Sequence, residues 1–179
     1  MENSHVAVFK GSYRHRIDAK GRIPVPAAFR RLLTEGGPAT AASTVVVTVL
    51  DQCLAVYPAQ EWTRVEAQLA ALPPFSAPVK ALSRLLSSRA LDCPLDVQGR
   101  ILLPATLRKS ARLEREAVVA GVLNRFEIWE PEAWAGFLAD SERLLDDASL
   151  AVQWPPPAAV PDLSPPSRPP RLPQGKPSR

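Results

Sequence analysis

The chain is poor in the side chains that build metal centres and disulfide frameworks. Its 179 residues include only two cysteines, Cys53 and Cys93, and two histidines, His5 and His15. These four residues are too few and too scattered for a zinc site or a disulfide framework. We therefore expect no metal ion and no other cofactor.

Long apolar runs and targeting signals are also missing. No stretch approaches the roughly 20 apolar residues that a membrane-spanning helix needs. The segment Met1–Lys10 is short and polar and carries no secretory signal. We therefore expect a cytoplasmic protein without a membrane partner. No small-molecule ligand is indicated.

Catalytic motifs are absent as well. The sequence contains no Walker loop, no dinucleotide fingerprint and no histidine-based dyad. The remaining candidates are Asp18 and Asp96 as paired carboxylates and Cys53 as a nucleophile. Each aspartate precedes an arginine that should keep it ionised, and Cys53 lies in an apolar strand where a thiol is ordinary core. We therefore expect no enzymatic activity.

The net charge of +4 is unevenly distributed. Residues 155–179 contain ten prolines, four basic residues and one acidic residue, and they supply +3 of the total. Such a segment buries too little apolar surface to offset its ordering entropy, which predicts a disordered tail. The alternative is a docking peptide or an auxiliary nucleic-acid arm that uses Arg168, Arg171, Lys176 and Arg179.

Charge is also segregated in the rest of the chain. Residues 10–31 carry seven Lys and Arg against Asp18 alone, whereas residues 126–150 carry seven Asp and Glu against Arg143 alone. The N-terminal segment is therefore suited to an anionic partner.

An internal repeat organises the sequence. Asp18–Arg31 (DAKGRIPVPAAFRR) recurs 78 residues later as Asp96–Lys109 (DVQGRILLPATLRK). The apolar runs that follow, and the tryptophan at 62, recur 72 residues later. Two blocks in the same order, separated by a loop of variable length, indicate a duplication.

The first part of each copy predicts an extended segment, an Asp-x-x-Gly turn and a short strand. We interpret this as a β-hairpin, because Asp and Gly favour such a turn. A proline, Pro26 or Pro104, suits the first position of the helix that follows, which in the first copy ends near Gly36. The predicted strands are residues 9–17 and 22–25 in the first copy and 89–95 and 100–103 in the second.

The second part of each copy predicts a further hairpin and an amphipathic helix. Its predicted strands are residues 44–50 and 53–57 in the first copy and 117–122 and 125–129 in the second. A linking helix over residues 79–86 follows the stop at Pro73–Pro74. Each half alone would leave strand edges exposed, and packing the halves together closes them. We therefore expect one pseudo-symmetric α+β domain with eight short strands.

The first extended segment is strongly basic on one side. Strand alternation places four side chains there: Lys10, Ser12, Arg14 and Arg16. With Lys20 in the turn and Arg22 beyond it, such cations can contact phosphates, and an arginine can bond a guanine edge in a DNA groove. Alternatively, the arginines of the two turns pair only with the aspartates of their own turns. The local pattern leaves both interpretations open.

One ordered set of residues spans both copies, from about Val8 to about Leu145. It comprises Phe9–Gly11, Asp18–Ile23 with Pro26 and Arg30, Cys53–Leu54, Tyr57–Pro58, Glu61–Trp62, Asp96–Ile101 with Pro104 and Arg108, and Asn124–Trp129. In this set the chain resembles the MraZ family of bacterial transcriptional regulators. The resemblance implies two AbrB-like, swapped-hairpin β-barrel halves with short helices, related by a pseudo-two-fold axis within one chain.

The resemblance also implies a function. Members of the family form ring-shaped homo-oligomers and associate with the nucleoid. They bind double-stranded DNA at G-rich direct repeats in the promoter of the cell-division and cell-wall gene cluster, usually as repressors. Several such contacts would act as one through effective concentration.

The DNA-binding motif of the family, Asp-x-x-x-Arg, falls on Asp18 with Arg22 and on Asp96 with Arg100. We interpret the two arginines as DNA contacts and four residues as turn-orienting groups: Asp18, Gly21, Asp96 and Gly99. The charge argument alone adds Lys20, Arg14 and Arg16 as phosphate contacts. Because Gln98 stands where the first turn has Lys20, we expect the two turns to contribute unequally.

The expected organisation has five parts. They are an N-terminal extension (1–7), a first repeat (8–74), a linking helix (75–88), a second repeat (89–147) and a disordered, proline-rich basic tail (148–179). Family members typically begin at the equivalent of Val8, and we hypothesise that Val8 is the true start.

Two alternatives to a promoter-binding regulator stay open. An AbrB-like antitoxin uses a similar hairpin to bind its own promoter, although such proteins usually carry one copy per chain. A scaffold that oligomerises without binding DNA would use Trp62, Trp129 and Trp134 as interface anchors, for which core packing is the ordinary role.

Overall fold

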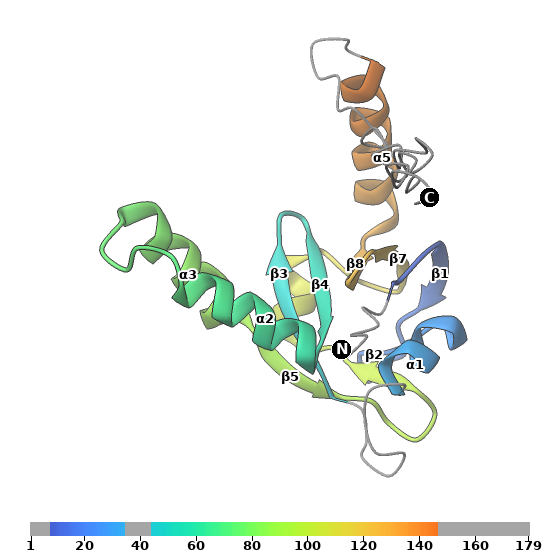
Figure 1. The fold of residues 1–179 in the computed structure, drawn as a ribbon. Coiled ribbons are helices and arrows are strands. Elements are labelled where there is room, and N and C mark those ends of the chain that lie inside the picture. Colours follow the sequence, from blue (N-terminus) through green and yellow to red (C-terminus); the bar gives the residue numbers. More distant parts are fainter. Residues whose placement is uncertain (1–7, 35–43, 147–179) are drawn as a thin grey trace, which may run out of the picture. The chain divides into compact units, whose positions relative to one another are not determined.

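The computed structural model describes residues 8–34 and 44–146 (Figure 1). The first repeat contains β1 (Ser12–Arg16), β2 (Arg22–Pro24), α1 (Ala27–Thr34), β3 (Thr44–Leu50), β4 (Cys53–Pro58) and α2 (Ala59–Ala70). Helix α3 (Ala77–Arg89) links it to the second repeat. That repeat contains β5 (Leu91–Pro94), β6 (Arg100–Leu102), α4 (Ala105–Ser110), β7 (Glu116–Val122), β8 (Arg125–Trp129) and α5 (Pro131–Asp146).

The predicted N-terminal extension, the end of the first helix near Gly36 and the proline-rich tail lie outside the described residues. The described residues up to Ser141 form one compact unit, and Glu142 onward belongs to a second. No helix in the two described ranges is long and apolar enough to span a bilayer.

The strands form one antiparallel six-stranded sheet, in the order β1-β7-β8-β4-β3-β5, and a separate two-stranded β2–β6 ribbon. Replacing each strand by its counterpart in the other repeat reverses the sheet order and leaves it otherwise unchanged. Two pairs join equivalent residues: Ile23 with Ile101 in the ribbon, and Ala55 with Glu127 in the sheet. The pseudo-two-fold axis therefore passes through both pairs, and the expected α+β fold of duplicated, swapped-hairpin halves is confirmed.

The prediction that each Asp-x-x-Gly turn closes a local hairpin is only half right. The turns form, but β1 pairs with β7 of the second repeat, and β5 pairs with β3 of the first. Strands β2 and β6 pair with each other, and local pairing is limited to the turn hydrogen bonds and an isolated bridge between Leu95 and Ile101. Exchanging partners in this way closes strand edges that a single repeat would leave open.

Three smaller predictions also change. Strand β1 is shorter than residues 9–17 because Gly11 adopts a positive φ of 89° and breaks the regular strand. Pro26 and Pro104 each precede their helix rather than opening it, and Pro104 is the N-cap of α4. Arg89 belongs to α3, so β5 begins only at Leu91. Pro24, which is awkward in a strand, is accommodated because both strands of a two-stranded ribbon are edges.

The main core lies between the ribbon, the inner side of the sheet and helices α1 and α4. Phe9, Phe29 and Phe126 form its aromatic centre, with ring centroids 5.2 to 5.4 Å apart. Ile23 and Ile101 contribute the buried side of the ribbon to the same core. Burial of these residues fixes the ribbon, and with it the two turns, against the sheet.

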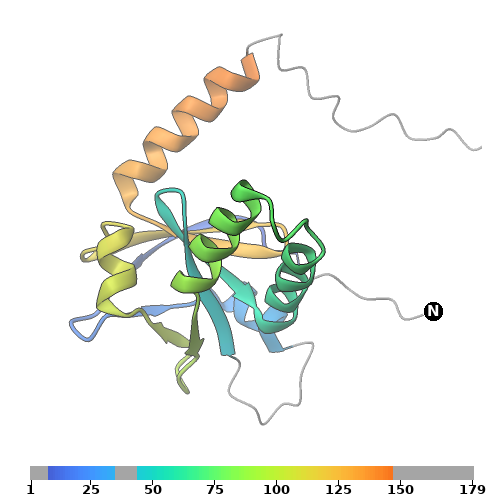
Figure 2. The same cartoon turned by 90° about the vertical axis from the view of Figure 1, so that its left-hand side faces the viewer.

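Helices from each repeat cover the outer side of the sheet. Trp62 of α2 and Leu86 of α3 pack with Val46 and Tyr57, and α3 crosses β3 in Figure 2. In the second repeat, Trp134 of α5 packs on Trp129. The three tryptophans of the scaffold hypothesis therefore take part in packing within the chain.

Candidate nucleic-acid interface

The first turn (Asp18–Arg22) is built around one carboxylate. Oδ1 of Asp18 accepts the backbone N–H groups of Lys20 and Arg22, both at 2.9 Å, and Oδ2 accepts Nε of Arg22 at 2.7 Å. The N–H of Gly21 donates to the carbonyl of Asp18, and Gly21 adopts a φ of 83° that side chains rarely tolerate. The turn-orienting role predicted for Asp18 and Gly21 thus has a specific geometry.

The second turn (Asp96–Arg100) repeats this geometry. Oδ1 of Asp96 accepts the N–H groups of Gln98 and Arg100, and Oδ2 accepts Nε of Arg100 at 2.8 Å. Gly99 adopts a φ of 72°. The two copies of Asp-x-x-Gly-Arg therefore encode the same local structure.

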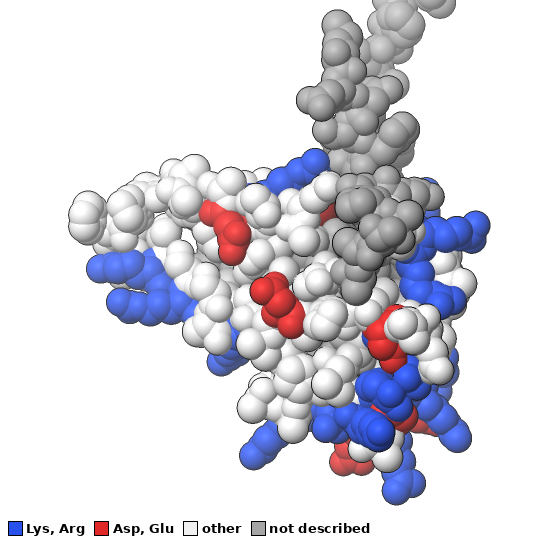
Figure 3. Space-filling model, turned by 90° about the horizontal axis from the view of Figure 1, so that it is seen from below, with Lys and Arg blue, Asp and Glu red and all other residues white. Residues whose placement is uncertain are grey.

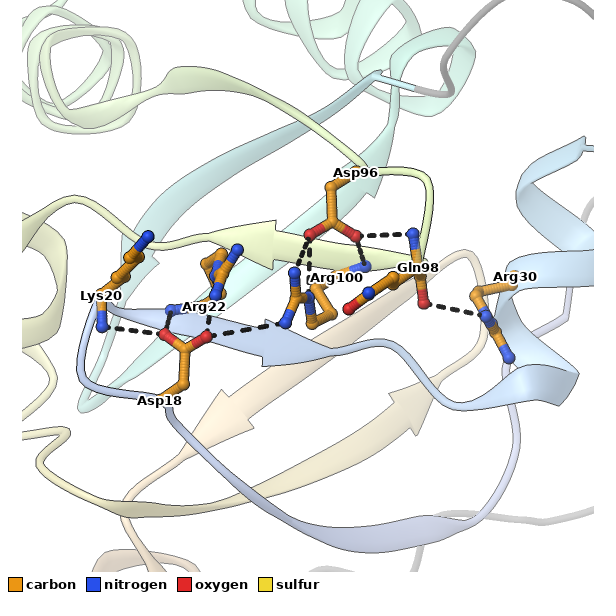
Figure 4. Close-up of polar contacts among 7 residues, drawn as sticks. All are labelled: Asp18, Lys20, Arg22, Arg30, Asp96, Gln98 and Arg100. Carbon is orange, nitrogen blue, oxygen red and sulfur yellow. Dashed lines mark hydrogen bonds and ion pairs between the residues drawn. The ribbon is translucent and has the colours of Figure 1, made fainter.

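The two turns lie together because the ribbon joins them. Figure 4 shows the guanidinium group of Arg100 between two carboxylates. Its Nη2 lies 2.7 Å from Asp96, and its Nη1 lies 3.7 Å from Oδ2 of Asp18 in the other repeat. Within residues 8–34 and 44–146, Arg22 by contrast pairs with one carboxylate, that of Asp18, with Nε 2.7 Å from Oδ2. The motif arginines are therefore engaged to different degrees.

Two further arginines cross from one repeat to the turn of the other. Nη1 of Arg30 donates to the carbonyl of Gln98 at 3.2 Å, and the Arg30 side chain packs where a Cβ on Gly99 would stand. The Nε of Arg108 packs against Gly21 in the same manner, 3.0 Å from the position of an added Cβ. Glycine at these positions thus provides both the turn conformation and the space for an arginine.

The turns are also tied across the ribbon by the backbone. The N–H of Val25 donates to the carbonyl of Gly99, and the N–H of Leu103 donates to the carbonyl of Gly21, both at 2.9 Å. Each turn is therefore held by its own aspartate and by a backbone hydrogen bond from the other repeat. Arg30 also donates to the second turn, whereas Arg108 packs on Gly21 and donates from Nε to Leu103 of its own repeat. We did not predict a role for Arg30 and Arg108 at the turns. The available signal was their recurrence at the same offset as the motif arginines.

The two turn aspartates are held in the charged state. Backbone and side-chain hydrogen bonds from Arg22, and a backbone hydrogen bond from Lys20, lower the pKa of Asp18. The side-chain hydrogen bond from Arg100 is the largest cause that lowers the pKa of Asp96. The ion pairs of the structural interpretation are thus present, and the predicted ionisation of both aspartates follows.

The other predicted contact residues are exposed. Arg14 and Arg16 lie on the outward side of β1, and Lys20 lies in the first turn, all open to solvent. Arg16 makes only a loose ion pair with Glu116, at 3.6 Å, and its side chain stays 86% exposed. Figure 3 shows Lys and Arg side chains gathered on the right, where Figure 1 places β1, β2 and α1.

The residues considered for catalysis do not form a reactive set. Cys53 and Cys93 are free thiols buried in the core, at 1% and 3% exposure. Burial raises the pKa of Cys93 to about 11 and that of Cys53 further still. Within residues 8–34 and 44–146, no group of three or more His, Cys, Asp or Glu residues is placed to hold a metal ion.

Comparison with known proteins identifies close relatives. The family model described as "MraZ protein, putative antitoxin-like" matches twice, over residues 8–85 and 86–152. A protein named Transcriptional regulator MraZ from Halothermothrix orenii is 38% identical over 146 residues, which cover 82% of this chain and 97% of the relative. Proteins of the same name from Lactiplantibacillus plantarum and Desulfitobacterium hafniense are 41% and 46% identical. They align over 78% and 75% of this chain and 94% and 90% of their own lengths.

Proposed function

We propose that this transcriptional regulator, whose chain belongs to the MraZ family, binds double-stranded promoter DNA through the face that carries β1 and the β2–β6 ribbon. The observation that carries the proposal is that two turns, each fixed by the hydrogen bonds of its aspartate, lie beside exposed cations. Rigid presentation matters because each side chain that is ordered only on binding costs conformational entropy. A site that is already ordered avoids most of that cost.

The cations divide by the contacts they suit. Lys20, Arg14 and Arg16 are exposed and suit phosphate oxygens, which position a protein on the duplex without reading sequence. Arg22 donates from Nε to Asp18, and its guanidinium group has further N–H donors for an external acceptor. Arginine in this state suits the paired acceptors of a guanine edge, which supports recognition of G-rich sites.

We further propose that copies of the chain assemble into a ring and bind direct repeats upstream of the cell-division and cell-wall gene cluster. A ring places equivalent turns at regular intervals, so that neighbouring subunits contact successive repeats. Several weak contacts then bind as one through effective concentration. Occupation of the promoter would repress transcription of this gene cluster. Binding to chromosomal DNA would place the protein at the nucleoid, in the cytoplasm.

The proposal is tested by one substitution and its matched control. Arg22→Ala removes the guanidinium group at the turn, whereas Arg84→Ala removes an exposed arginine from α3, away from the turns. Fluorescence anisotropy with a duplex from the promoter of the chain's own operon should show loss of binding for Arg22→Ala and unchanged binding for Arg84→Ala. Light scattering should give the same oligomeric mass for both. Loss of mass together with loss of binding would make Arg22 a structural residue.

A second candidate is an antitoxin, which the description of the family as antitoxin-like favours. An antitoxin would also bind its own promoter, so DNA binding does not separate the two functions. Co-expression with each neighbouring gene does, because only an antitoxin relieves the growth arrest caused by a toxin. We place this candidate second because both copies of the turn occur in one chain.

A further inference from the structure

Equivalent positions of the two repeats differ sharply in charge around the turns. The first repeat has Arg14, Arg16 and Lys20, and the second has Asp92, Pro94 and Gln98 at the equivalent positions, 78 residues later. Three positive charges thus correspond to one negative charge. The backbone geometry of the turns is nearly identical, so this difference is not required by the fold.

The two motif arginines also differ, and the arginine of the first turn is again the one better placed to bind an anion. Arg100 is engaged by Asp96 through Nε and Nη2 and by Asp18 through Nη1, and its side chain is 23% exposed. Arg22 is engaged by Asp18 alone among the described carboxylates, with Nε 2.7 Å from Oδ2, and its side chain is 30% exposed. A guanidinium group that pairs with two carboxylates has more of its positive charge compensated than one that pairs with a single carboxylate. The second turn therefore lacks the cations of the first, and its motif arginine is paired with one more carboxylate.

We propose that only the first turn contacts DNA and that the second turn positions it. Arg100 acts through Asp18: its Nη1 contact holds the carboxylate that in turn orients Arg22 and the backbone of the first turn. Arg100 is thus a positioning residue, although its motif is the same as that of Arg22. This inference rests on the proposed function.

The division of roles has a consequence for the DNA site. A chain with two equivalent contacting turns would present a two-fold symmetric surface, which matches an inverted repeat. A chain with one contacting turn presents an asymmetric surface, which matches one unit of a direct repeat. We therefore expect each subunit to occupy one repeat unit with its first turn.

The first test compares two equivalent and exposed positions that carry no assigned contact. Ala19→Cys and Val97→Cys place a thiol in the first and second turn, and Val97 is fully exposed. A thiol-tethered iron chelate cleaves DNA close to its attachment point, and the buried Cys53 and Cys93 leave the unsubstituted protein as a control for stray labelling. We expect strand cleavage within the repeats from position 19 and little or none from position 97. Equal cleavage from both positions would overturn the inference.

The second test separates contact from positioning by salt dependence. Log affinity falls with log salt, and each lost phosphate contact reduces the steepness of this fall, here called the slope, by about 0.9. Lys20→Ala should lower the slope by about this amount, and Gln98→Ala should leave slope and affinity unchanged. Arg100→Ala and Arg100→Lys should both weaken binding about tenfold without changing the slope, because lysine keeps the charge but loses the planar fork that spans two carboxylates.

The outcomes also distinguish this inference from the proposed function. A less steep salt dependence for Arg100→Ala, or unchanged DNA affinity for Arg100→Lys, would show that Arg100 is a phosphate contact. Either result would overturn this inference and leave the proposed function standing. Absence of binding by the unsubstituted chain to its own promoter would overturn both proposals.

Discussion

Shortening an isoleucine at the centre of the β2–β6 ribbon should weaken both repeats equally. Ile23 and Ile101 face each other on the pseudo-two-fold axis and are 1% and 0% exposed. Because the sheet exchanges strands between the repeats, neither repeat retains a complete sheet when the other opens. Ile23→Val and Ile101→Val should therefore act on one shared unfolding equilibrium.

The expected magnitude follows from the removal of one buried methylene group. Such a substitution costs about 1 kcal/mol, within a range of about 0.5 to 1.5 kcal/mol. A loss of about 1 kcal/mol raises the globally open fraction roughly fivefold. Similar burial at the two positions predicts similar costs.

Amide hydrogen exchange measures this effect in each repeat separately. Protected amides of β3 and β4 report on the first repeat, and those of β7 and β8 report on the second. Both sets should exchange roughly fivefold faster in either variant, at a fixed protein concentration because assembly also stabilises the fold. Faster exchange confined to the repeat that carries the substitution would show that the repeats unfold independently and would refute the reasoning.

Three further predictions concern the turns and the thiols. Gly99→Ala places a Cβ on the Arg30 side chain and forces alanine into a positive φ, so it should lower the free energy of unfolding by about 1–2 kcal/mol in a urea titration and weaken DNA binding. Val97→Ala in the same turn should change neither quantity. An equal effect of the two substitutions would argue against the packing of Arg30 on Gly99. The pKa of Asp18 and of Asp96 is lowered in the folded state, so their stabilising contribution should be constant above the unfolded pKa of about 3.9 and disappear as the pH falls through the lowered value. The stability difference between the chain and a double Asp18→Asn, Asp96→Asn variant should accordingly shrink below about pH 4, whereas a difference that grew there would reverse the assigned sign. Cys53 and Cys93 should react with a thiol reagent only after denaturation, and rapid labelling of the native chain would contradict their burial.

The local elements of each repeat were predictable because their signals are local. Asp and Gly at fixed spacing define each turn, and alternation along β1 separated the exposed Arg14 and Arg16 from the half-buried His15. Strand ends were less predictable, since the break at Gly11 depends on how Phe9 reaches across to Leu123. Propensity along the chain carries no information of that kind.

Partner choice between strands was not predictable from the residue pattern. Strand β1 has the same alternation whether it pairs with β2 or with β7, and only the resemblance to a known family indicated the exchange. Arg30 and Arg108 were missed for the same reason. Their contacts with the opposite turns exist only after the strands have exchanged partners. The unequal engagement of Arg22 and Arg100 likewise depends on the distance between Asp18 and Arg100, which lie 82 residues apart in sequence.

The most direct test of promoter recognition is an anisotropy titration of the unsubstituted chain at two salt concentrations. One duplex carries the region upstream of the chain's own operon, and the other has the same length and composition with its direct repeats scrambled. We predict tight binding to the first duplex, markedly weaker binding to the second, and a steep fall in affinity at the higher salt concentration. Equal affinity for the two duplexes would contradict sequence-specific recognition and leave only a basic surface.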